Sequence, residues 1–202
     1  MRDLHGWTYL PTRHHRKVSV AVASYNNPDG LATLIASFRA QTHPNWELVV
    51  VHDGPGPESR RLVDVVDDPR IVFYEAEHRG SWGHPHREAA LRRCTGDILG
   101  LTNEDNYYVP VYLEAMVNAL ETKNVDLVYC NTIHSHHLWA PMDVALQKGR
   151  IDLGSWLANR SAVADVPFRD FSFAGDWTFL SDVLAKCKTG TTKIDHYLFV
   201  HN

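Results

Sequence analysis

Three short polar segments carry the side chains best suited to chemistry in this sequence of 202 residues. Each segment directly follows an apolar run, and they are Tyr25-Asn26-Asn27, His52-Asp53-Gly54 and Asn103-Glu104-Asp105-Asn106. Carboxylate and amide oxygens are hard ligands of the kind that Mg²⁺ and Mn²⁺ prefer. The segments are therefore candidates for a metal ion and a polar ligand, provided that the fold brings them together.

The apolar runs predict the elements that must position these segments. Strands are expected at residues 18–24, 46–51, 70–74 and 97–101, and helical spacing of apolar residues is found over 30–41, 58–66 and 85–93. This alternation predicts one α/β domain with a mostly parallel central sheet and helices on both faces. Ligands of such sheets bind beyond the carboxyl ends of the strands, so the polar segments should meet at one edge.

The second half of the chain is less regular and carries more aromatic and histidine residues. The pattern predicts a helix at 110–121, a second helix that follows residues 175–177 and ends at 186, and strands at 125–131, 153–158 and 193–200. Loops between such elements are suited to shaping a second ligand site.

Composition excludes several classes of protein. The net charge of -4 with scattered Lys and Arg predicts no nucleic acid partner. Three widely spaced cysteines without a Cys-x-x-Cys pair argue against a disulfide framework and favour a reducing compartment. No apolar run approaches the ~20 residues of a transmembrane helix or forms a signal peptide, which predicts a soluble cytoplasmic protein. Residues 1–17 are expected to be an N-terminal leader on the surface, and no feature indicates an oligomeric state.

A series of motifs in a fixed order resembles family 2 glycosyltransferases of the GT-A fold, a Rossmann-like fold. The motifs are residues 18–26, Gln41-Thr42 with Trp46-Glu47, Asp53-Gly54, Gly96-Asp97-Ile98, the Asp105 segment and Gly175-Asp176, and the resemblance covers about residues 18–202. It implies a nucleotide-binding half at 18–106 and an acceptor-binding half at 107–202. It also implies transfer of a hexosyl or deoxyhexosyl group from a nucleotide-sugar, with UDP-sugars favoured, to a glycan or other hydroxyl acceptor with inversion.

The resemblance implies a divalent metal at the donor diphosphate. Asn103 and Asp105 align with the family's Asp-x-Asp motif, so Asp105 is the expected metal ligand, while Asn103 and Glu104 are expected to contact the donor. His201 matches a metal-binding histidine on the last strand and offsets the missing aspartate. An imidazole ligand favours Mn²⁺ over Mg²⁺, although Mg²⁺ stays possible. The alternatives are an Asx-rich turn that caps the following helix and an unpaired terminal histidine.

Nucleotide recognition is implied for the first two polar segments. Ser24, Tyr25 and Asn26 are expected to hold the base, and Asp53 to accept a hydrogen bond from a ring N–H such as that of uracil. The alternative is that Asp53 belongs to a plain turn after a strand.

The loop at residues 77–87 matches the family's glycine-containing loop only loosely. Arg79 or Arg87 is expected to pair with the diphosphate, because a guanidinium group presents a fork of donors to phosphate. Trp82, His84 and His86 lie where the donor sugar is expected. The alternative is that the two histidines cap or cover the start of a helix.

An inverting transfer needs one general base and no covalent nucleophile. By the family's pattern Asp176 is that base and Trp177 a platform for a sugar ring, the alternative being that Asp176 is an N-cap. The run His134-Ser135-His136-His137 is weak evidence for zinc because no further ligand motif accompanies it. Contact with a sugar, or a solvated loop, explains it better.

Two other functions fit parts of the sequence. A catalytically inactive nucleotide- or sugar-binding module is favoured by Asn103, which replaces an expected carboxylate. A nucleotidyltransferase is disfavoured because the loop after the first strand is neither glycine-rich nor basic.

Overall fold

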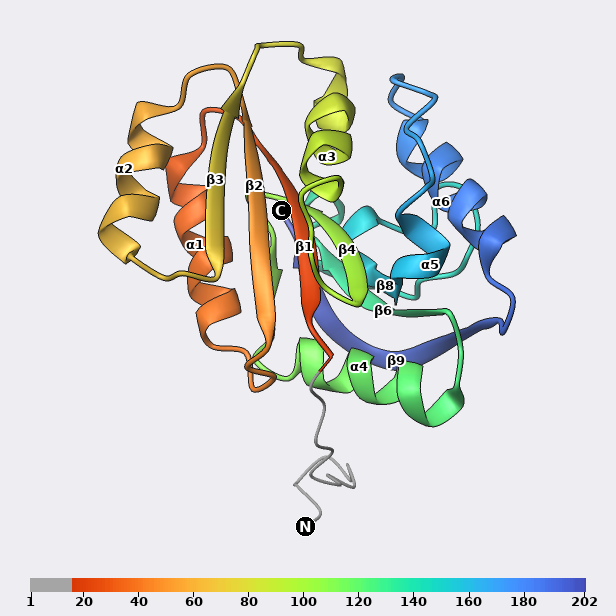
Figure 1. Cartoon of the computed structure of the whole chain (residues 1–202). Coiled ribbons are helices and arrows are strands. Elements are labelled where there is room, and N and C mark those ends of the chain that lie inside the picture. Colours follow the sequence, from red (N-terminus) through yellow and green to blue (C-terminus); the bar gives the residue numbers. More distant parts are fainter. Residues whose placement is uncertain (1–15) are drawn as a thin grey trace.

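The structure is a computed structural model that describes residues 16–202, shown in Figure 1. The predicted leader lies outside the described residues except for its last two positions. The strands are β1 (Val18–Ser24), β2 (Trp46–Asp53), β3 (Ile71–Ala76), β4 (Ile98–Asn103), β5 (Tyr107–Tyr108), β6 (Leu127–His134), β7 (Ala140–Met142), β8 (Trp156–Asn159) and β9 (Thr191–His201). The helices are α1 (Pro28–Arg39), α2 (Pro57–Val66), α3 (His84–Leu91), α4 (Tyr112–Lys123), α5 (Arg160–Val163) and α6 (Gly175–Lys186), with short 3₁₀ turns η1 (Ser81–Gly83), η2 (Ser135–His137) and η3 (Leu153–Ser155).

The described strands form one sheet in the order β3-β2-β1-β4-β8-β6-β9-β5, with β7 paired to β6. Strands β3, β2, β1 and β4 are all parallel, as the βα alternation predicts. The second half is mixed, because β8 runs antiparallel to both β4 and β6, whereas β6 and β9 are parallel. The prediction of a mostly parallel α/β sheet is confirmed, and its antiparallel part is confined to the second half.

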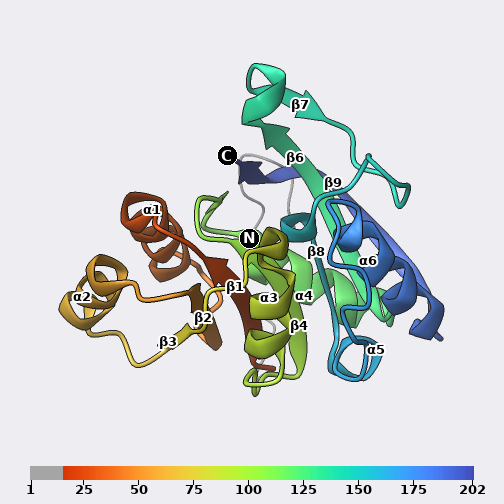
Figure 2. The same ribbon diagram turned by 90° about the horizontal axis from the view of Figure 1, so that it is seen from above.

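Helices pack on both faces of this sheet, as Figures 1 and 2 show. Alternate residues of β1 point to opposite faces, so Val20 and Val22 join one core while Ala21 joins the other. The first core contains buried side chains of α1 and α4 and partly buried ones of α2, and the second contains those of α3, α5 and α6. Within residues 16–202, no helix is long and apolar enough to cross a membrane.

The strand register brings the three polar segments to one edge. Ser24 at the end of β1 is paired with His52 on β2, and Ala23 is paired with Asn103 on β4. Strands β2 and β4 continue to Asp53 and Asn103, beyond their expected ends, because the neighbouring strands supply backbone partners. The prediction that these segments converge is confirmed.

The expected strand at residues 153–158 is only partly formed. Its first three residues form η3, because the Asp152 carboxylate accepts a hydrogen bond from Gly154 N at 2.9 Å and so caps a turn. The strand itself begins at Trp156. A Cβ atom on Gly154 would lie 2.6 Å from Tyr108 Oη and Phe199 Cζ, so this turn can approach the sheet only because residue 154 is glycine.

Candidate active site

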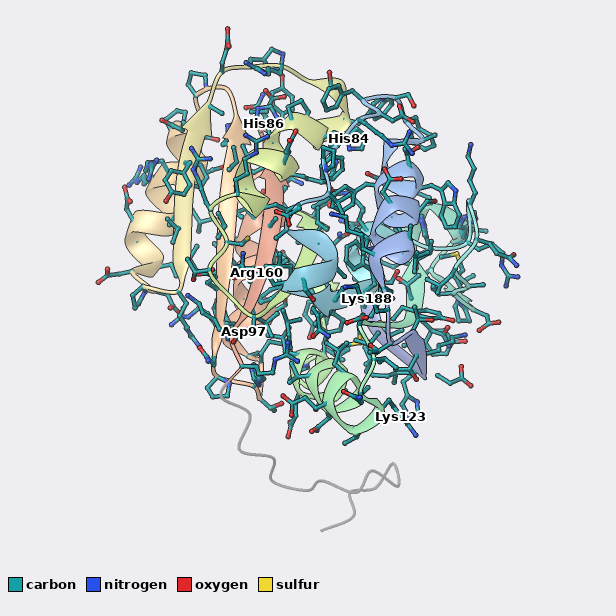
Figure 3. The ribbon with its side chains drawn as sticks, turned by 45° about the vertical axis from the view of Figure 1, so that its right-hand side comes forward. His84, His86, Asp97, Lys123, Arg160 and Lys188 are labelled. Carbon is teal, nitrogen blue, oxygen red and sulfur yellow. The ribbon has the colours of Figure 1, made fainter. Side chains whose placement is uncertain are left out.

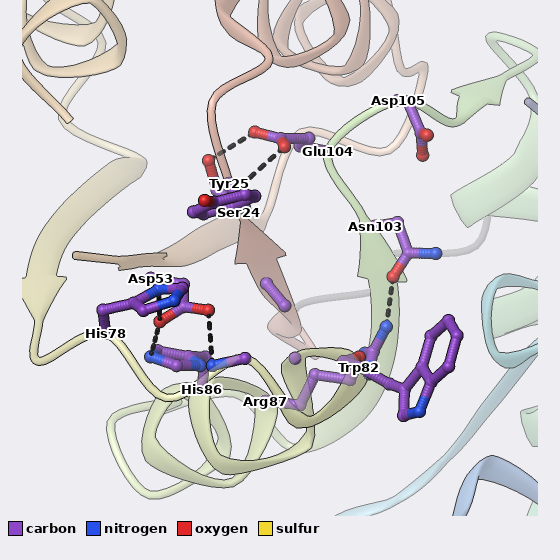
Figure 4. A pocket seen from close by; sticks show the side chains of 13 residues that line it. Ser24, Tyr25, Asp53, His78, Trp82, His86, Arg87, Asn103, Glu104 and Asp105 are labelled. Atoms are coloured by element: carbon purple, nitrogen blue, oxygen red, sulfur yellow. Dashed lines mark hydrogen bonds and ion pairs between the residues drawn. The ribbon is translucent and has the colours of Figure 1, made fainter. Parts of the chain in front are cut away.

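Two adjoining cavities lie at the edge where the polar segments meet. The first has a volume of about 380 Å³ and the second about 470 Å³, within the range of small-molecule sites. Trp82, Arg87 and Asn103 line both cavities and form the wall between them. The first cavity, drawn in Figure 4, is also lined by Ser24, Tyr25, Asp53, His78, His86, Glu104 and Asp105, and the second by His134, His136, His137, Asp152, Asp176, Trp177 and His201.

The turn that follows β4 sends its two acidic side chains in different directions. Glu104 accepts hydrogen bonds from Ser24 Oγ and, at 2.7 Å, from Tyr25 N, so it holds the end of β1 (Figure 4). Burial raises the pKa of Glu104 despite these bonds. Asp105 keeps a buried Oδ1 that has no hydrogen-bond partner among residues 16–202. The alternative of a helix-capping turn is wrong, because α4 begins at Tyr112 and has no side-chain cap.

Asp53 organises the loop that closes the first cavity. Its carboxylate accepts hydrogen bonds from Arg79 N at 2.7 Å and Gly80 N at 2.9 Å, and it lies 3.1 Å from His78 Nδ1 and 3.2 Å from His86 Nε2. Burial opposes ionisation of Asp53, but the backbone N–H groups and histidines outweigh it and lower the pKa. Asp53 is therefore more than part of a plain turn, and its expected bond to a base is still a prediction.

An aromatic surface forms the mouth of the first cavity. The Tyr25 ring is half exposed and stacks on His78, with ring centroids 5.5 Å apart and an interplanar angle of 27°. Asn26 adopts a left-handed conformation and donates from its backbone N to His52 Nε2 at 3.2 Å. The sequence placed His52 in a candidate polar segment without a role of its own, and did not single out His78. The position of His52 directly before Asp53 was an available signal, whereas nothing local marks His78.

Of the two candidate arginines, Arg87 is the one that lines the cavities. The Arg79 side chain is 63% exposed and lies 3.6 Å from Glu77, and only its backbone contributes, through Asp53. Arg87 donates through Nη2 to Asn103 Oδ1 and through Nη1 to Trp82 O at 2.6 Å. Its Nε is buried and has no partner in the described chain. Burial lowers the pKa of Arg87, but a guanidinium group remains protonated in proteins.

His84 and His86 are buried at the start of α3, and neither caps it, because the N-cap position Gly83 has no side-chain cap hydrogen bond. Both lie in the first turn of α3, as Figure 3 shows. His84 contacts Ser172 O through Nε2 at 3.0 Å, and His86 contacts Glu77 O through Nε2 at 3.2 Å. Each histidine therefore fixes a loop against α3.

Asp176 lies in the first turn of α6 and is not its N-cap, which is Ala174 and has no side-chain cap. Its Oδ1 is buried, lies 3.3 Å from His84 Nδ1 and 3.8 Å from Arg87 Nη1, and makes no hydrogen bond within residues 16–202. The side chain as a whole is 42% exposed, so the carboxylate can be reached from the second cavity. Burial raises the pKa of Asp176 despite the charge of Arg87.

His201 lies on β9 and is held by Asp152, a residue that sequence reasoning missed. His201 Nε2 is 3.2 Å from Asp152 Oδ2, and Nδ1 is buried without a hydrogen-bond partner in the described part of the chain. Burial acts against protonation of His201, but the bond to Asp152 and its charge raise the pKa. His201 therefore has a partner, contrary to the alternative of an unpaired terminal histidine. The 3₁₀ turn beginning at Leu153 explains how Asp152 is presented, yet no sequence signal ties it to His201.

The histidine run lines the second cavity. His134 stacks on His201 with centroids 4.2 Å apart and an angle of 14°, and His136 lies 5.5 Å from the same ring. Across residues 16–202, no group of three or more His, Cys, Asp or Glu side chains is arranged to hold a metal ion. The geometry adds nothing to the zinc interpretation and places these rings beside the second cavity.

The wall between the cavities ends in a strained aromatic turn. Gly80, Ser81, Trp82 and Gly83 all have positive φ, which is costly for Ser81 and Trp82. Trp82 is 63% exposed and packs edge-on against Phe173 at 5.2 Å. Trp177 lines the second cavity from α6. Backbone strain of this kind clusters at ligand sites, and here it presents an indole ring to both cavities.

Curated relatives share part of this chain. It is 25% identical over 115 residues to UDP-Glc:alpha-D-GlcNAc-diphosphoundecaprenol beta-1,3-glucosyltransferase WfaP of Escherichia coli, covering 56% of this chain and 45% of the relative. It is 30% identical over 131 residues to O-antigen biosynthesis protein RfbC of Myxococcus xanthus, covering 61% of this chain and 10% of the relative. The chain therefore spans less than half the length of these relatives.

Solved structures share the fold. S. aureus TarS matches with a TM-score of 0.79 at 19% identity over 92% of this chain and 60% of that chain, and another of its structures is a complex with UDP-GlcNAc. The mannosyltransferase PcManGT from Pyrobaculum calidifontis, in complex with GDP-Man and Mn²⁺, matches with a TM-score of 0.69 at 18% identity over 93% of this chain and 57% of that chain.

A family model matches the region that builds both the parallel sheet and most of the site. It is the model of glycosyl transferase family 2, and it covers residues 19–164. This span includes the polar segments at the strand ends, Arg87 and the histidine run, in the order that the sequence motifs predict. The chain belongs to glycosyl transferase family 2 and has the GT-A fold.

Proposed function

We propose that this chain transfers a hexosyl or deoxyhexosyl group from a UDP-sugar to a hydroxyl acceptor with inversion at the anomeric carbon. The observation that carries the proposal is the placement of Asp176. This carboxylate has a buried oxygen without a hydrogen-bond donor and lies in a cavity that shares a wall with the polar cavity at the strand ends. A proton acceptor therefore lies beside a site of nucleotide size.

The first cavity supplies contacts suited to a nucleotide. The Tyr25 ring presents a flat half-exposed face for a base, and Ser24, Asn26 and Asp53 bring polar groups to the same edge. We assign residues 18–106 to nucleotide binding and residues 107–202 to acceptor binding. The E. coli relative named above is a UDP-Glc glucosyltransferase, which supports UDP as the first nucleotide to test.

Asp105 and His201 fit a divalent cation. Each presents a buried atom that lacks a hydrogen-bond partner among residues 16–202, Oδ1 and Nδ1 respectively. Asp152 fixes His201 through the other ring nitrogen, an arrangement usual for metal-binding histidines. Two protein ligands are enough where substrate phosphates complete the shell, and the imidazole favours Mn²⁺, with Mg²⁺ possible. When bound, the cation supplies Lewis-acid stabilisation of the leaving diphosphate.

Asp176 acts as the general base. Its carboxylate takes the proton of the acceptor hydroxyl as that oxygen forms a bond to the anomeric carbon. The bond from the anomeric carbon to the diphosphate oxygen breaks, and its electron pair leaves with the diphosphate. A single displacement of this kind inverts the anomeric centre. Trp82 and Trp177 offer ring faces to the sugars on either side, with Asn103, Glu104 and His86 lining the donor side. His84 supports it indirectly, because its Nδ1 accepts from Arg87 Nη1 at 3.1 Å.

The acceptor lies in the second cavity and is a glycan or another hydroxyl compound. The E. coli relative is named for a diphosphoundecaprenol-linked acceptor, so a lipid-linked sugar is a natural member of the test set.

A panel of nucleotide-sugars with Mn²⁺, tested for hydrolysis and for transfer to lipid-linked and free glycans, tests the proposal. Turnover of a UDP-sugar is the expected result. Binding of UDP without turnover of any donor would instead support the inactive module. Turnover of only GDP- or dTDP-linked sugars would contradict the choice of nucleotide.

A further inference from the structure

The guanidinium group of Arg87 lies at the junction of the two cavities without a hydrogen-bonded carboxylate. Its side chain is only 6% exposed, and its partners are the neutral acceptors Asn103 Oδ1, Trp82 O and His84 Nδ1. The nearest acid is Asp176, whose Oδ1 lies 3.8 Å from Nη1, beyond hydrogen-bond distance. Asp105 and Asp152 also act on Arg87 through their charge, but only at longer range.

Residue 103 decides this state of Arg87. An aspartate in the same place would put a carboxylate oxygen where the Asn103 amide oxygen now accepts from Nη2. A charge-assisted pair would then form and neutralise the guanidinium group locally. With asparagine, the hydrogen bond that orients Arg87 is kept, and no carboxylate is hydrogen-bonded to the guanidinium group, whose nearest negative charge is Asp176 at 3.8 Å.

Arg87 also retains donor capacity. A guanidinium group carries five N–H donors, and Nε–H is buried without an acceptor in the described residues. A buried unpaired donor is costly, so an anion that supplied an acceptor would be stabilised. Arg87 lines the first cavity together with Asp105 and the second together with Asp176. A diphosphate that joins a nucleotide in one cavity to a sugar beside the other must pass this wall.

We propose that Arg87, left without a hydrogen-bonded carboxylate by Asn103, binds the donor diphosphate directly and supplies part of the charge stabilisation that a divalent cation provides. This inference rests on the proposed function. Nucleoside diphosphates should then bind without metal, and the metal should improve binding without being required for it. The missing carboxylate of residue 103 thus adds positive charge to the site through Arg87.

Calorimetric binding of UDP and of uridine in EDTA, and again in Mn²⁺, tests the proposal. For the wild type, UDP should bind in EDTA, and more tightly than uridine. Asn103→Asp should weaken UDP binding in EDTA by about 10- to 100-fold, the effect of one charge-assisted hydrogen bond. Because a restored carboxylate favours the cation, the ratio of UDP affinity in Mn²⁺ to that in EDTA should rise. Uridine binding should not change.

Three further variants separate charge from structure. Arg87→Met should abolish the preference for UDP over uridine in EDTA, and Arg87→Lys should retain part of it as a point charge without the fork. Arg92→Met is the matched control, because Arg92 pairs with Glu88 at the exposed C-terminal end of the same helix. If Arg87→Met does not fold by circular dichroism, Asn103→Asp and Arg87→Lys still decide the matter.

The outcomes of this experiment are distinct. UDP binding to the wild type in Mn²⁺ but not in EDTA overturns the role of Arg87 and leaves the proposed function intact. Equal UDP affinity of Asn103→Asp and wild type in EDTA also overturns the role of Arg87. A loss of UDP affinity in EDTA with Arg79→Met but not with Arg87→Met overturns it too. Failure of UDP, GDP and dTDP to bind even in Mn²⁺ refutes the proposed function itself.

Discussion

Nδ1 of His84 lies 3.3 Å from Oδ1 of Asp176, yet this imidazole donates no proton to that oxygen. Its Nε2 faces the carbonyl oxygen of Ser172 at 3.0 Å, and a carbonyl only accepts, so Nε2 carries the hydrogen. Nδ1 faces Nη1 of Arg87 at 3.1 Å, and a guanidinium group only donates, so Nδ1 accepts. Burial lowers the pKa of His84, in keeping with the neutral ring. Asp176 is thereby left as a proton acceptor.

Asp176→Asn should keep UDP binding and lose transfer. The amide occupies the same space but cannot accept the acceptor proton, so we expect kcat to fall about 10²- to 10⁴-fold. Asp182→Asn is the control, because Asp182 lies on the same helix and pairs with Arg169 at the surface. Steady-state kinetics and UDP calorimetry measure both effects. Transfer by Asp176→Asn at the wild-type rate would show that another group is the base.

The acid limb of the pH profile should lie above the usual range of an aspartate. The base works only when ionised, and burial raises the pKa of Asp176 above its ordinary value of about 3.9. Activity should therefore decline as the pH falls through that raised pKa. The profile of kcat/KM measures this, with circular dichroism at each pH to show that the protein stays folded. Full activity down to about pH 4 contradicts the assignment.

Asp105→Ala should remove the effect of Mn²⁺ on nucleotide binding while leaving the fold intact. The buried Oδ1 has no hydrogen-bond partner in residues 16–202, so its loss leaves no protein group unpaired. We expect the Tm without ligands to be equal to or above that of the wild type. Thermal shift with UDP, with and without Mn²⁺, measures the difference. An equal Mn²⁺-dependent increase in Tm with UDP in both proteins would show that Asp105 is not a metal ligand.

Asp126→Asn should make the protein less stable at neutral pH and equally stable in acid. Asp126 accepts from Lys188 N at 2.7 Å and Thr189 N at 2.8 Å. Burial raises its pKa, but the Thr189 bonds and others outweigh this and lower the pKa to about 2.

The unfolded value is about 3.9, so the ionised form stabilises the fold above about pH 4, and this contribution is lost as the pH falls toward 2. Because Asp126 is largely solvated, we expect a loss of about 1 kcal/mol in the free energy of unfolding at pH 7. Urea unfolding at pH 7, 4 and 3 measures it, with the exposed Asp64→Asn as control. If the difference in the free energy of unfolding between Asp126→Asn and the wild type is as large at pH 3 as at pH 7, it does not come from the ionised Asp126 carboxylate.

The sequence by itself determines the alternating elements and the polar segments at the strand ends. Hydrophobic periodicity is local, so apolar runs of the Val18–Ser24 kind predict buried strands. Because parallel strands end at a common edge, the convergence of Asp53 and Asn103 also follows from the pattern. Motif order also singles out Asp176, which lines the second cavity in the structure, and its role as base is still a prediction.

Only the tertiary structure decides which side chains meet. The local sequence pattern cannot distinguish Arg79 from Arg87. Helix α3 directs the Arg87 side chain inward, whereas the loop before the helix leaves the Arg79 side chain in solvent. Nor can the local pattern pair Asp152 with His201, which are joined by the packing of η3 against β9. Contacts between distant segments depend on the whole sheet order and on close approaches such as that at Gly154. The sheet order and packing set the direction in which each side chain points, and that direction makes the site.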